Sequence, residues 1–139
     1  SADKVYVYDF DKRLRRSWGH TSYSSGYCKL RVLNGKVVVP GQGSMSVYTL
    51  EGHLAKQIMI PGMSTHYKSL AVCGDDSVIL SDYQANSVSR INIDSGEVTW
   101  TSKCVKEPAG VVCYNNRYVL VTANNTDARI WILDINTGS

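Results

Sequence analysis

Residues 77–96 read SVILSDYQANSVSRINIDSG, and this stretch contains the unit that the rest of the chain repeats. It opens on a short apolar run at 77–80, passes through a polar loop at 84–87 and ends in a turn at Ser95-Gly96. Short runs of β-branched and apolar residues between turn-forming residues are typical of strands. The stretch therefore predicts strands joined by a polar loop and closed by a turn.

The same turns and loops recur in both directions from this stretch. A tight turn follows an apolar run at Asn34-Gly35, Asp75-Asp76 and Asn115-Asn116, at spacings of 41 and 40 residues. Such pairs suit two-residue hairpins, which need a left-handed backbone. A second set of turns lies at Asp11-Lys12, Glu51-Gly52, Ser95-Gly96 and Thr137-Gly138, and polar loops lie at 41–44, 84–87 and 124–127. Each repeat therefore contains four short strands.

The segments between the turns also read as strands. They lie at 4–10, 37–39, 46–50, 77–80, 118–121 and 129–133, and no stretch sustains the i, i+3, i+4, i+7 apolar pattern of a helix. A β-sandwich also has short strands, but it has no reason to repeat its turn chemistry every 40 to 44 residues. A repeat of about 40 to 50 residues with four strands is the signature of a blade, so we predict an all-β propeller.

The repeats fill one partial propeller domain over residues 1–139. We place a half blade at 4–18, complete blades at 27–60 and 68–101, and an incomplete blade at 109–139. This makes about three and a quarter blades, whereas a closed ring needs roughly four to eight. Because an open arc leaves apolar faces unburied at its ends, we expect a larger ring, made either by a longer polypeptide or by association of copies. Two copies would supply the blades of a six-bladed ring.

Composition sets further limits. With 43% hydrophobic and 19% charged residues among 139, the chain has the balance of a folded domain. The net charge of +3 allows nucleic acid as a partner but does not demand it. No apolar run approaches the roughly 18 to 20 residues of a membrane span, and the first residues lack the apolar core of a signal peptide, so we expect no membrane partner. Nine tyrosines, three tryptophans and one phenylalanine suit half-exposed strands and binding surfaces.

The four cysteines are Cys28, Cys73, Cys104 and Cys113, and they have no metal-binding spacing, so we expect no metal. Because Cys73 and Cys113 sit in apolar runs, we expect them to be reduced and buried, which favours a cytoplasmic location. The sequon Asn124-Asn125-Thr126 indicates the secreted alternative, although three-residue matches often arise by chance.

Three segments, 107–113, 115–121 and 128–134, resemble the NHL-repeat blade. That pattern runs Pro-x-Gly-Val, a turn, a hydrophobic strand, an Asn-containing loop, then Arg-Ile and a strand ending in Asp and Gly. The middle blade matches it through Ser81-Asp82-Tyr83, Asn86, Arg90-Ile91 and Asp94-Ser95-Gly96, and residues 5–11 and 47–52 match it at the third strand. The first complete blade lacks the Pro-x-Gly-Val start and the Arg-Ile pair. The resemblance implies a non-catalytic recognition module of the kind found in tripartite-motif ubiquitin ligases, which binds RNA or protein.

Two segments, 94–100 and 133–138, also look like the Asp-x-x-Thr-Gly-x-x-x-Trp signature of quinoprotein-type propellers. Those enzymes hold a quinone cofactor with many blades, and a chain of this length lacks most of such a site. We interpret the match as shared physics, in which glycine makes the turn and Trp100 packs between blades.

Catalytic chemistry has little support in the sequence. Hydrolase, phosphate-binding and metalloprotease motifs are absent, and His20, His53 and His66 share no motif. Strand-end carboxylates at Asp9, Asp82, Asp94 and Asp134 are explained by turn-forming hydrogen bonds. We expect no catalytic residues, no cofactor and no enzyme, with a quinoprotein or hydrolase propeller enzyme as the least favoured alternative.

Binding has more support. In a propeller, the connections between blades and the loops between second and third strands lie on one face. The residues predicted to bind a partner there are His20, Tyr23, Tyr27, His66, Tyr67, Lys68, Tyr83, Asn86, Lys103 and Lys106, with Gln42 and Asn124 in the same loops. Aromatic rings beside cations suit single-stranded RNA and protein partners alike, and ordinary solvated loop residues remain the alternative. The basic run Lys12, Arg13, Arg15 and Arg16 is predicted to protect an outermost strand from edge aggregation, with phosphate binding as the alternative.

From the sequence we therefore expect a non-catalytic recognition or scaffold module that binds protein or RNA through its loop face. Protein is slightly favoured because the net charge is modest. The alternative is a self-assembling propeller fragment, a homo-oligomer whose role is structural only.

Overall fold

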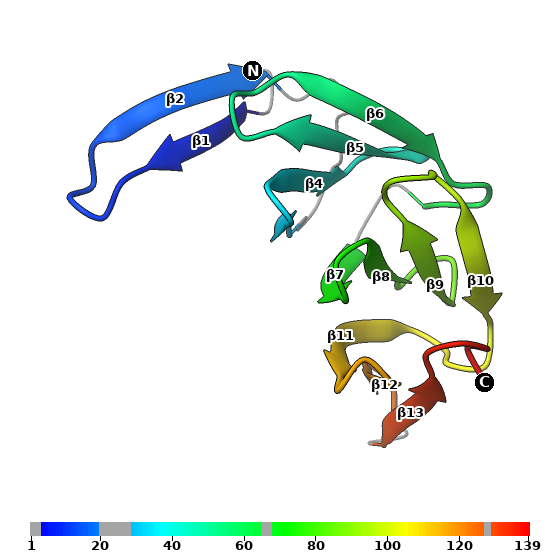
Figure 1. Cartoon of the computed structure of the whole chain (residues 1–139). Coiled ribbons are helices and arrows are strands. Elements are labelled where there is room, and N and C mark those ends of the chain that lie inside the picture. The colour runs from blue at the N-terminus through cyan, green and yellow to red at the C-terminus, as the bar shows by residue number, and fades with distance from the viewer. Residues whose placement is uncertain (1–3, 20–28, 65–67, 127–128) are drawn as a thin grey trace.

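The computed structural model describes residues 4–19, 29–64, 68–126 and 129–139. Within these ranges the chain forms thirteen strands in antiparallel sheets of two, four, four and three strands (Figure 1). The predicted all-β propeller architecture, with blades of four antiparallel strands in a partial ring, is confirmed. The described part of the chain has no helix of the length and apolarity needed to cross a membrane.

Each sheet takes its strands in sequence order, as consecutive hairpins require. The first sheet contains β1 (Lys4–Tyr8) and β2 (Leu14–Gly19). The second contains β3 (Arg31–Leu33), β4 (Lys36–Pro40), β5 (Ser44–Thr49) and β6 (Leu54–Met59). The third contains β7 (Lys68–Cys73), β8 (Ser77–Asp82), β9 (Ser87–Asn92) and β10 (Val98–Ser102). The fourth contains β11 (Pro108–Tyr114), β12 (Tyr118–Ala123) and β13 (Ile130–Asp134).

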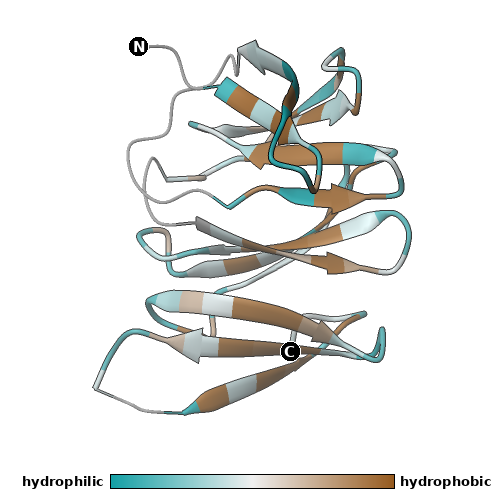
Figure 2. Cartoon of the chain, turned by 90° about the vertical axis from the view of Figure 1, so that its left-hand side faces the viewer, coloured by the Kyte–Doolittle hydropathy of each residue, from teal (hydrophilic) through white to brown (hydrophobic). Residues whose placement is uncertain are grey.

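The four sheets follow one another around an open arc. The inner side of the arc carries β7 and β11, and its outer side carries β2, β6 and β10 (Figure 1). Turned on its side, the chain is a stack of sheets with hydrophobic residues along the strands (Figure 2). This is the arrangement of propeller blades, each of which contacts only its neighbours.

Burial of both faces of the middle sheets produces the core. Successive side chains of a strand point to opposite faces, so Val38 packs toward the third sheet while Val37 and Val39 pack toward the first hairpin. In β8 all six residues are buried, with Val78 and Leu80 on one side and Ile79 on the other. The continuous apolar run of β8 is therefore explained by layers on both sides of the sheet.

Two of the three predicted tight turns have the expected backbone. Asn34 and Gly35 have φ values of 49° and 73°, and Asn115 and Asn116 have values of 52° and 51°. A turn lies at Asp75-Asp76 as predicted, within residues 74–76, but the left-handed backbone expected there was wrong for both aspartates, because Gly74 takes that conformation with a φ of 68°. Three residues separate Cys73 from its cross-strand partner Ser77, and glycine adopts positive φ without the steric cost that aspartate would have.

Tryptophan side chains dock on the glycine turn of the following sheet. A Cβ atom added at Gly138 would lie 2.5 Å from Cε3 of Trp100, and one added at Gly52 would lie 2.8 Å from Cε3 of Trp18. The indole N–H of Trp100 also donates to the Ile135 carbonyl at 2.8 Å. The prediction that Trp100 packs between blades is confirmed, and the fold uses the same contact at Trp18.

The prediction of reduced thiols was wrong for Cys73 and Cys113, which form a disulfide. The two residues are 40 apart in sequence, one repeat length, and their Cα atoms are 5.5 Å apart. Because β7 and β11 are equivalent strands of adjacent sheets, residues separated by one repeat become neighbours. Burial in apolar runs was correctly inferred for Cys73, but burial does not keep two adjacent thiols apart. Cys104 is free and exposed.

Candidate functional site

The candidate site is the loop face, which we define by residues 41–43, 60–64, 83–86, 103–107 and 124–126. These segments are the β4–β5, β8–β9 and β12–β13 loops and the connections that follow β6 and β10. Hydrogen bonds between them show that they gather at one end of the sheets, as predicted. The Ile60 N–H, for example, donates to the Gly43 carbonyl at 3.1 Å.

A chain of hydrogen bonds ties the third and fourth sheets together on this face. Lys103 Nζ donates to the Ala85 carbonyl at 2.9 Å, and the Glu107 N–H donates to Oδ1 of Asn86 at 2.8 Å. The Glu107 carbonyl in turn accepts the Asn124 N–H at 2.9 Å. The left-handed backbone at Asn86 and Glu107, with φ values of 50° and 52°, lets both loops turn tightly enough to meet. The loops therefore form a platform whose backbone is fixed from two sides.

Asp82 fixes the platform between the second and third sheets. Asp82 is 1% exposed, and its carboxylate accepts the Ser64 N–H at 2.7 Å and the Ala85 N–H at 3.1 Å. The Ser64 hydroxyl also donates to it. A buried carboxylate requires such donors, since an unpaired charge away from water is costly. Asp82 therefore holds the connection after β6 against the β8–β9 loop.

The other strand-end carboxylates also have structural partners. Asp9 accepts the Arg13 N–H at 2.9 Å, and Asp134 accepts the Asn136 N–H at 2.8 Å, as expected of turn-forming residues. Asp94 differs, because its carboxylate lies 2.6 Å from Nζ of Lys36, while Asn92 makes the turn by accepting the Asp94 N–H. Within the ranges that the structure describes, no three His, Cys, Asp or Glu side chains gather as metal ligands.

The structure brings together part of the predicted partner-binding set. Asn86, Lys103 and Lys106 are exposed on adjoining loops, and Tyr83 is half-buried in the loop of Asn86. Lys68 begins β7. The exposed Gln42 and Asn124 lie in two further loops of the face. His20, Tyr23, Tyr27, His66 and Tyr67 lie outside the described residues.

The basic run is divided between two places. Lys12 and Arg13 are exposed in the turn before β2, so the prediction that they lie on the outermost strand was wrong. The turn extends to them because the Asp9 side chain caps it. Nε of Arg15 donates to Asp9 at 2.8 Å. A terminal nitrogen of Arg16 donates to the Leu50 carbonyl of the next sheet at 2.9 Å. Arg15 and Arg16 thus support the first hairpin and its docking.

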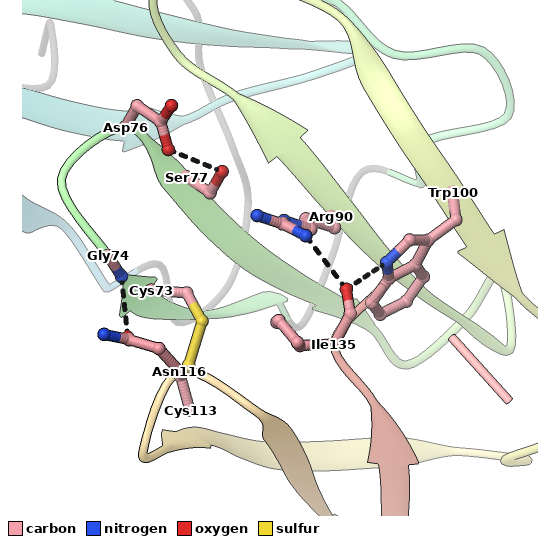
Figure 3. The surroundings of a disulfide bond; sticks show 9 residues. All are labelled: Cys73, Gly74, Asp76, Ser77, Arg90, Trp100, Cys113, Asn116 and Ile135. Carbon is pink, nitrogen blue, oxygen red and sulfur yellow. Dashed lines mark hydrogen bonds between the residues drawn. A yellow bond between two sulfur atoms is a disulfide. The ribbon is translucent and has the colours of Figure 1, made fainter. Parts of the chain in front are cut away.

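Sequence reasoning missed a second set of contacts, which surrounds the disulfide at the opposite end of the sheets (Figure 3). The Gly74 N–H donates to Oδ1 of Asn116 at 3.1 Å. Between the outer strands of the same two sheets, the Ile135 carbonyl accepts a hydrogen bond from the Arg90 guanidinium at 3.0 Å and another from the Trp100 indole N–H at 2.8 Å. The spacing of Cys73 and Cys113 by one repeat was the signal that could have located this junction.

Comparisons with known proteins support the fold. Neither a family model nor a curated protein matches the chain. Among solved structures, BamB from Moraxella catarrhalis aligns with a TM-score of 0.69 and 18% identity over 92% of this chain and 39% of its own. Virginiamycin B lyase from Staphylococcus aureus aligns with a TM-score of 0.65 and 15% identity over 96% of this chain and 49% of its own. The Neurospora crassa Pan2 WD40 domain aligns with a TM-score of 0.60 and 18% identity over 80% and 33%.

These similarities place the chain among β-propellers. The chain spans less than half the length of each of these three proteins. The alignments cover 39% of BamB, 49% of virginiamycin B lyase and 33% of the Pan2 chain. At identities of 18% or less, the likeness establishes the architecture. Activity and partners have to be argued from the loop face itself.

Proposed function

We propose that the chain is a recognition or scaffold module that binds a macromolecular partner through its loop face. The observation that supports this most directly is the hydrogen-bonded platform formed by Lys103, Asn86, Glu107 and Asn124. A platform with a fixed backbone presents its exposed side chains without a large ordering cost on binding. The proposed role is non-catalytic, because the carboxylates at Asp9, Asp82, Asp94 and Asp134 are all engaged in turns or ion pairs.

Protein is the favoured partner, with single-stranded RNA as the alternative. The net charge is only +3. One of the lysines of the face, Lys103, donates a hydrogen bond to the Ala85 carbonyl. RNA binding relies on many free cations and falls steeply with added salt. Because the Lys103 ammonium group is bonded to the Ala85 carbonyl, the face is better suited to protein contacts than to RNA.

A pair of matched variants tests the loop face. A photo-crosslinking amino acid in place of Lys106 should give covalent adducts with the partner, which mass spectrometry identifies. The yield of the adduct is then measured with the purified partner. The control carries the same amino acid at Arg117, an exposed position in the β11–β12 turn at the opposite end of the sheets. Equal adducts at both positions would contradict a specific face. For the RNA alternative, a labelled oligouridine should lose affinity with salt and with Lys106→Ala but not with Arg117→Ala.

We further propose that the blades are of the NHL type. The support is the match of residues 107–134 to the NHL pattern, now carried by β11, β12 and β13. A cytoplasmic location was expected from reduced thiols, and the Cys73–Cys113 disulfide removes that reason. The location itself is a prediction still to be tested.

The second candidate role is assembly into a ring. The specific observation is that both ends of the arc leave apolar side chains exposed, with Tyr6 and Tyr8 at one end and Val112, Ile130 and Ile132 at the other. Such faces are buried between sheets elsewhere in the chain. A second copy of the chain, or further blades of a longer polypeptide, would cover them.

A further inference from the structure

The chain contains one Asn-x-Ser/Thr sequence, Asn124-Asn125-Thr126, and the structure places it in the loop between β12 and β13. All three residues are exposed. The loop is held at both of its asparagines, because the Asn125 amide donates to the Lys106 carbonyl at 3.0 Å and the Asn124 N–H donates to Glu107 at 2.9 Å. The middle residue therefore anchors the loop while Asn124 lies on the surface.

Exposure at this position is what a glycan requires. A sugar attached to asparagine is bulky and polar, so the folded chain must leave the modified side chain in solvent. Asn124 meets that condition, whereas an asparagine inside a strand of the middle sheets would not. The bond from Asn125 to Lys106 also fixes the loop without using the Asn124 side chain.

The disulfide is an independent observation that points to the compartment. Disulfides persist in oxidising compartments such as the lumen of the endoplasmic reticulum, and they are rare in the cytosol. Asparagine glycosylation takes place in that lumen. Cys73 and Cys113 bring together two strands 40 residues apart, so their bond belongs to the folded chain and not to a local loop.

We propose that the chain folds in the oxidising lumen of a secretory pathway and that Asn124 is an N-glycosylation acceptor there. The glycan lies beside Lys106 and Glu107, on the fourth-sheet side of the loop face.

Expression behind a secretion signal in eukaryotic cells tests the site. Both the secreted and the lumenal chain should migrate more slowly in electrophoresis than after digestion with peptide-N-glycosidase. The shift should be lost in Asn124→Gln and in Thr126→Ala. It should be kept in Thr126→Ser, which retains the hydroxyl, and in the matched control Asn125→Gln. A wild-type chain that carries the Cys73–Cys113 bond but no glycan would overturn the proposed site.

A second measurement tests the compartment. The chain is made in the cytoplasm, trapped with an alkylating reagent at lysis and mapped by mass spectrometry. We expect Cys73 and Cys113 to be alkylated there and joined in the lumenal chain. A joined pair in cytoplasmic material would show that the bond forms without an oxidising lumen, and the inference about the compartment would fail.

Discussion

At the scale of single residues, Gly52 and Gly138 decide how neighbouring sheets dock. Their φ values of 94° and 73° are left-handed, and an added Cβ atom at either would meet the ring of Trp18 or Trp100. Glycine is therefore required twice at these positions, once by the backbone and once by the ring that lies over it. The contact joins the turn of one sheet to the outer strand of the sheet before it.

Gly52→Ala should consequently cost more stability than a glycine substitution that only strains the backbone. Gly43 is the control, because its φ is 66° but an added Cβ there meets no described atom within 4 Å. Left-handed strain should lower the free energy of unfolding by about 1 kcal/mol in Gly43→Ala, and overlap with Trp18 should raise the loss to about 3 kcal/mol in Gly52→Ala. Urea denaturation measures both. Equal losses would mean that the indole ring moves aside without cost.

Asp82 is the residue whose removal should most weaken the loop face. Asp82→Ala leaves the half-buried N–H groups of Ser64 and Ala85 without this acceptor, at a cost of about 3 kcal/mol in the free energy of unfolding. Asp94→Ala removes an exposed ion pair with Lys36 and should cost less than about 1 kcal/mol. Thermal and urea unfolding of the two variants compare them, and a loss in Asp82→Ala as small as in Asp94→Ala would disprove the anchoring role.

At the scale of the elements, the disulfide joins the inner strands of two sheets. Cys73 ends β7 and Cys113 lies near the end of β11, with Gly74 and Asn116 bonded beside them. The closed loop contains one whole repeat, so the cross-link restricts a large part of the unfolded chain. This junction complements the docking of Trp100 on Gly138 farther out between the same two sheets.

Loss of this cross-link should be the largest single effect on stability. In the chain-entropy model, a loop of about 40 residues corresponds to about 4 kcal/mol, so Cys73→Ala/Cys113→Ala should lose about that much. Added reductant should destabilise the wild-type chain and leave the double variant unchanged. Cys104→Ala is the control, because Cys104 is free and exposed. If reductant left the free energy of unfolding of the wild-type chain unchanged, the disulfide would be absent or would not contribute to stability.

What could be predicted from the sequence depends on how local the cause is. Strands, polar loops and turns follow from residues within a few positions, and the two-residue hairpin at Asn34-Gly35 was inferred correctly. At Asn115-Asn116 the left-handed backbone was correct, but the turn has three residues between Tyr114 and Tyr118. The turn after β7 differed from the prediction in its backbone, because Gly74 adopts the left-handed conformation more easily than Asp75 or Asp76. The partners of Arg16 and Cys73 lie in a neighbouring sheet, and only a superposition of the repeats could have identified them. The loops of the predicted face do gather at one end of the sheets, where Asn86 and Lys103 hold them together, and partner binding there stays a prediction.

At the scale of the whole molecule, the two ends of the arc differ from its middle. The third sheet has neighbours on both faces, whereas the outer face of the fourth sheet exposes Val112, Ile130 and Ile132 by 59%, 65% and 63%. At the other end, Tyr6 and Tyr8 stack with ring centroids 6.4 Å apart and are also exposed. Contiguous apolar surface of this kind marks an interaction site or an aggregation liability.

As a separate chain, the molecule should therefore associate with itself. Light scattering on a size-exclusion column should show a mass that rises from 15.4 kDa toward twice that value as concentration increases. Ile130→Lys/Ile132→Lys should shift the equilibrium back to the single chain, because burying two ammonium groups without partners opposes docking. Met59→Lys is the control, since Met59 is 71% exposed on β6, away from both ends. A constant 15.4 kDa at all concentrations would show that the open faces do not bind each other. Further blades of a longer polypeptide would then be the partners that cover them.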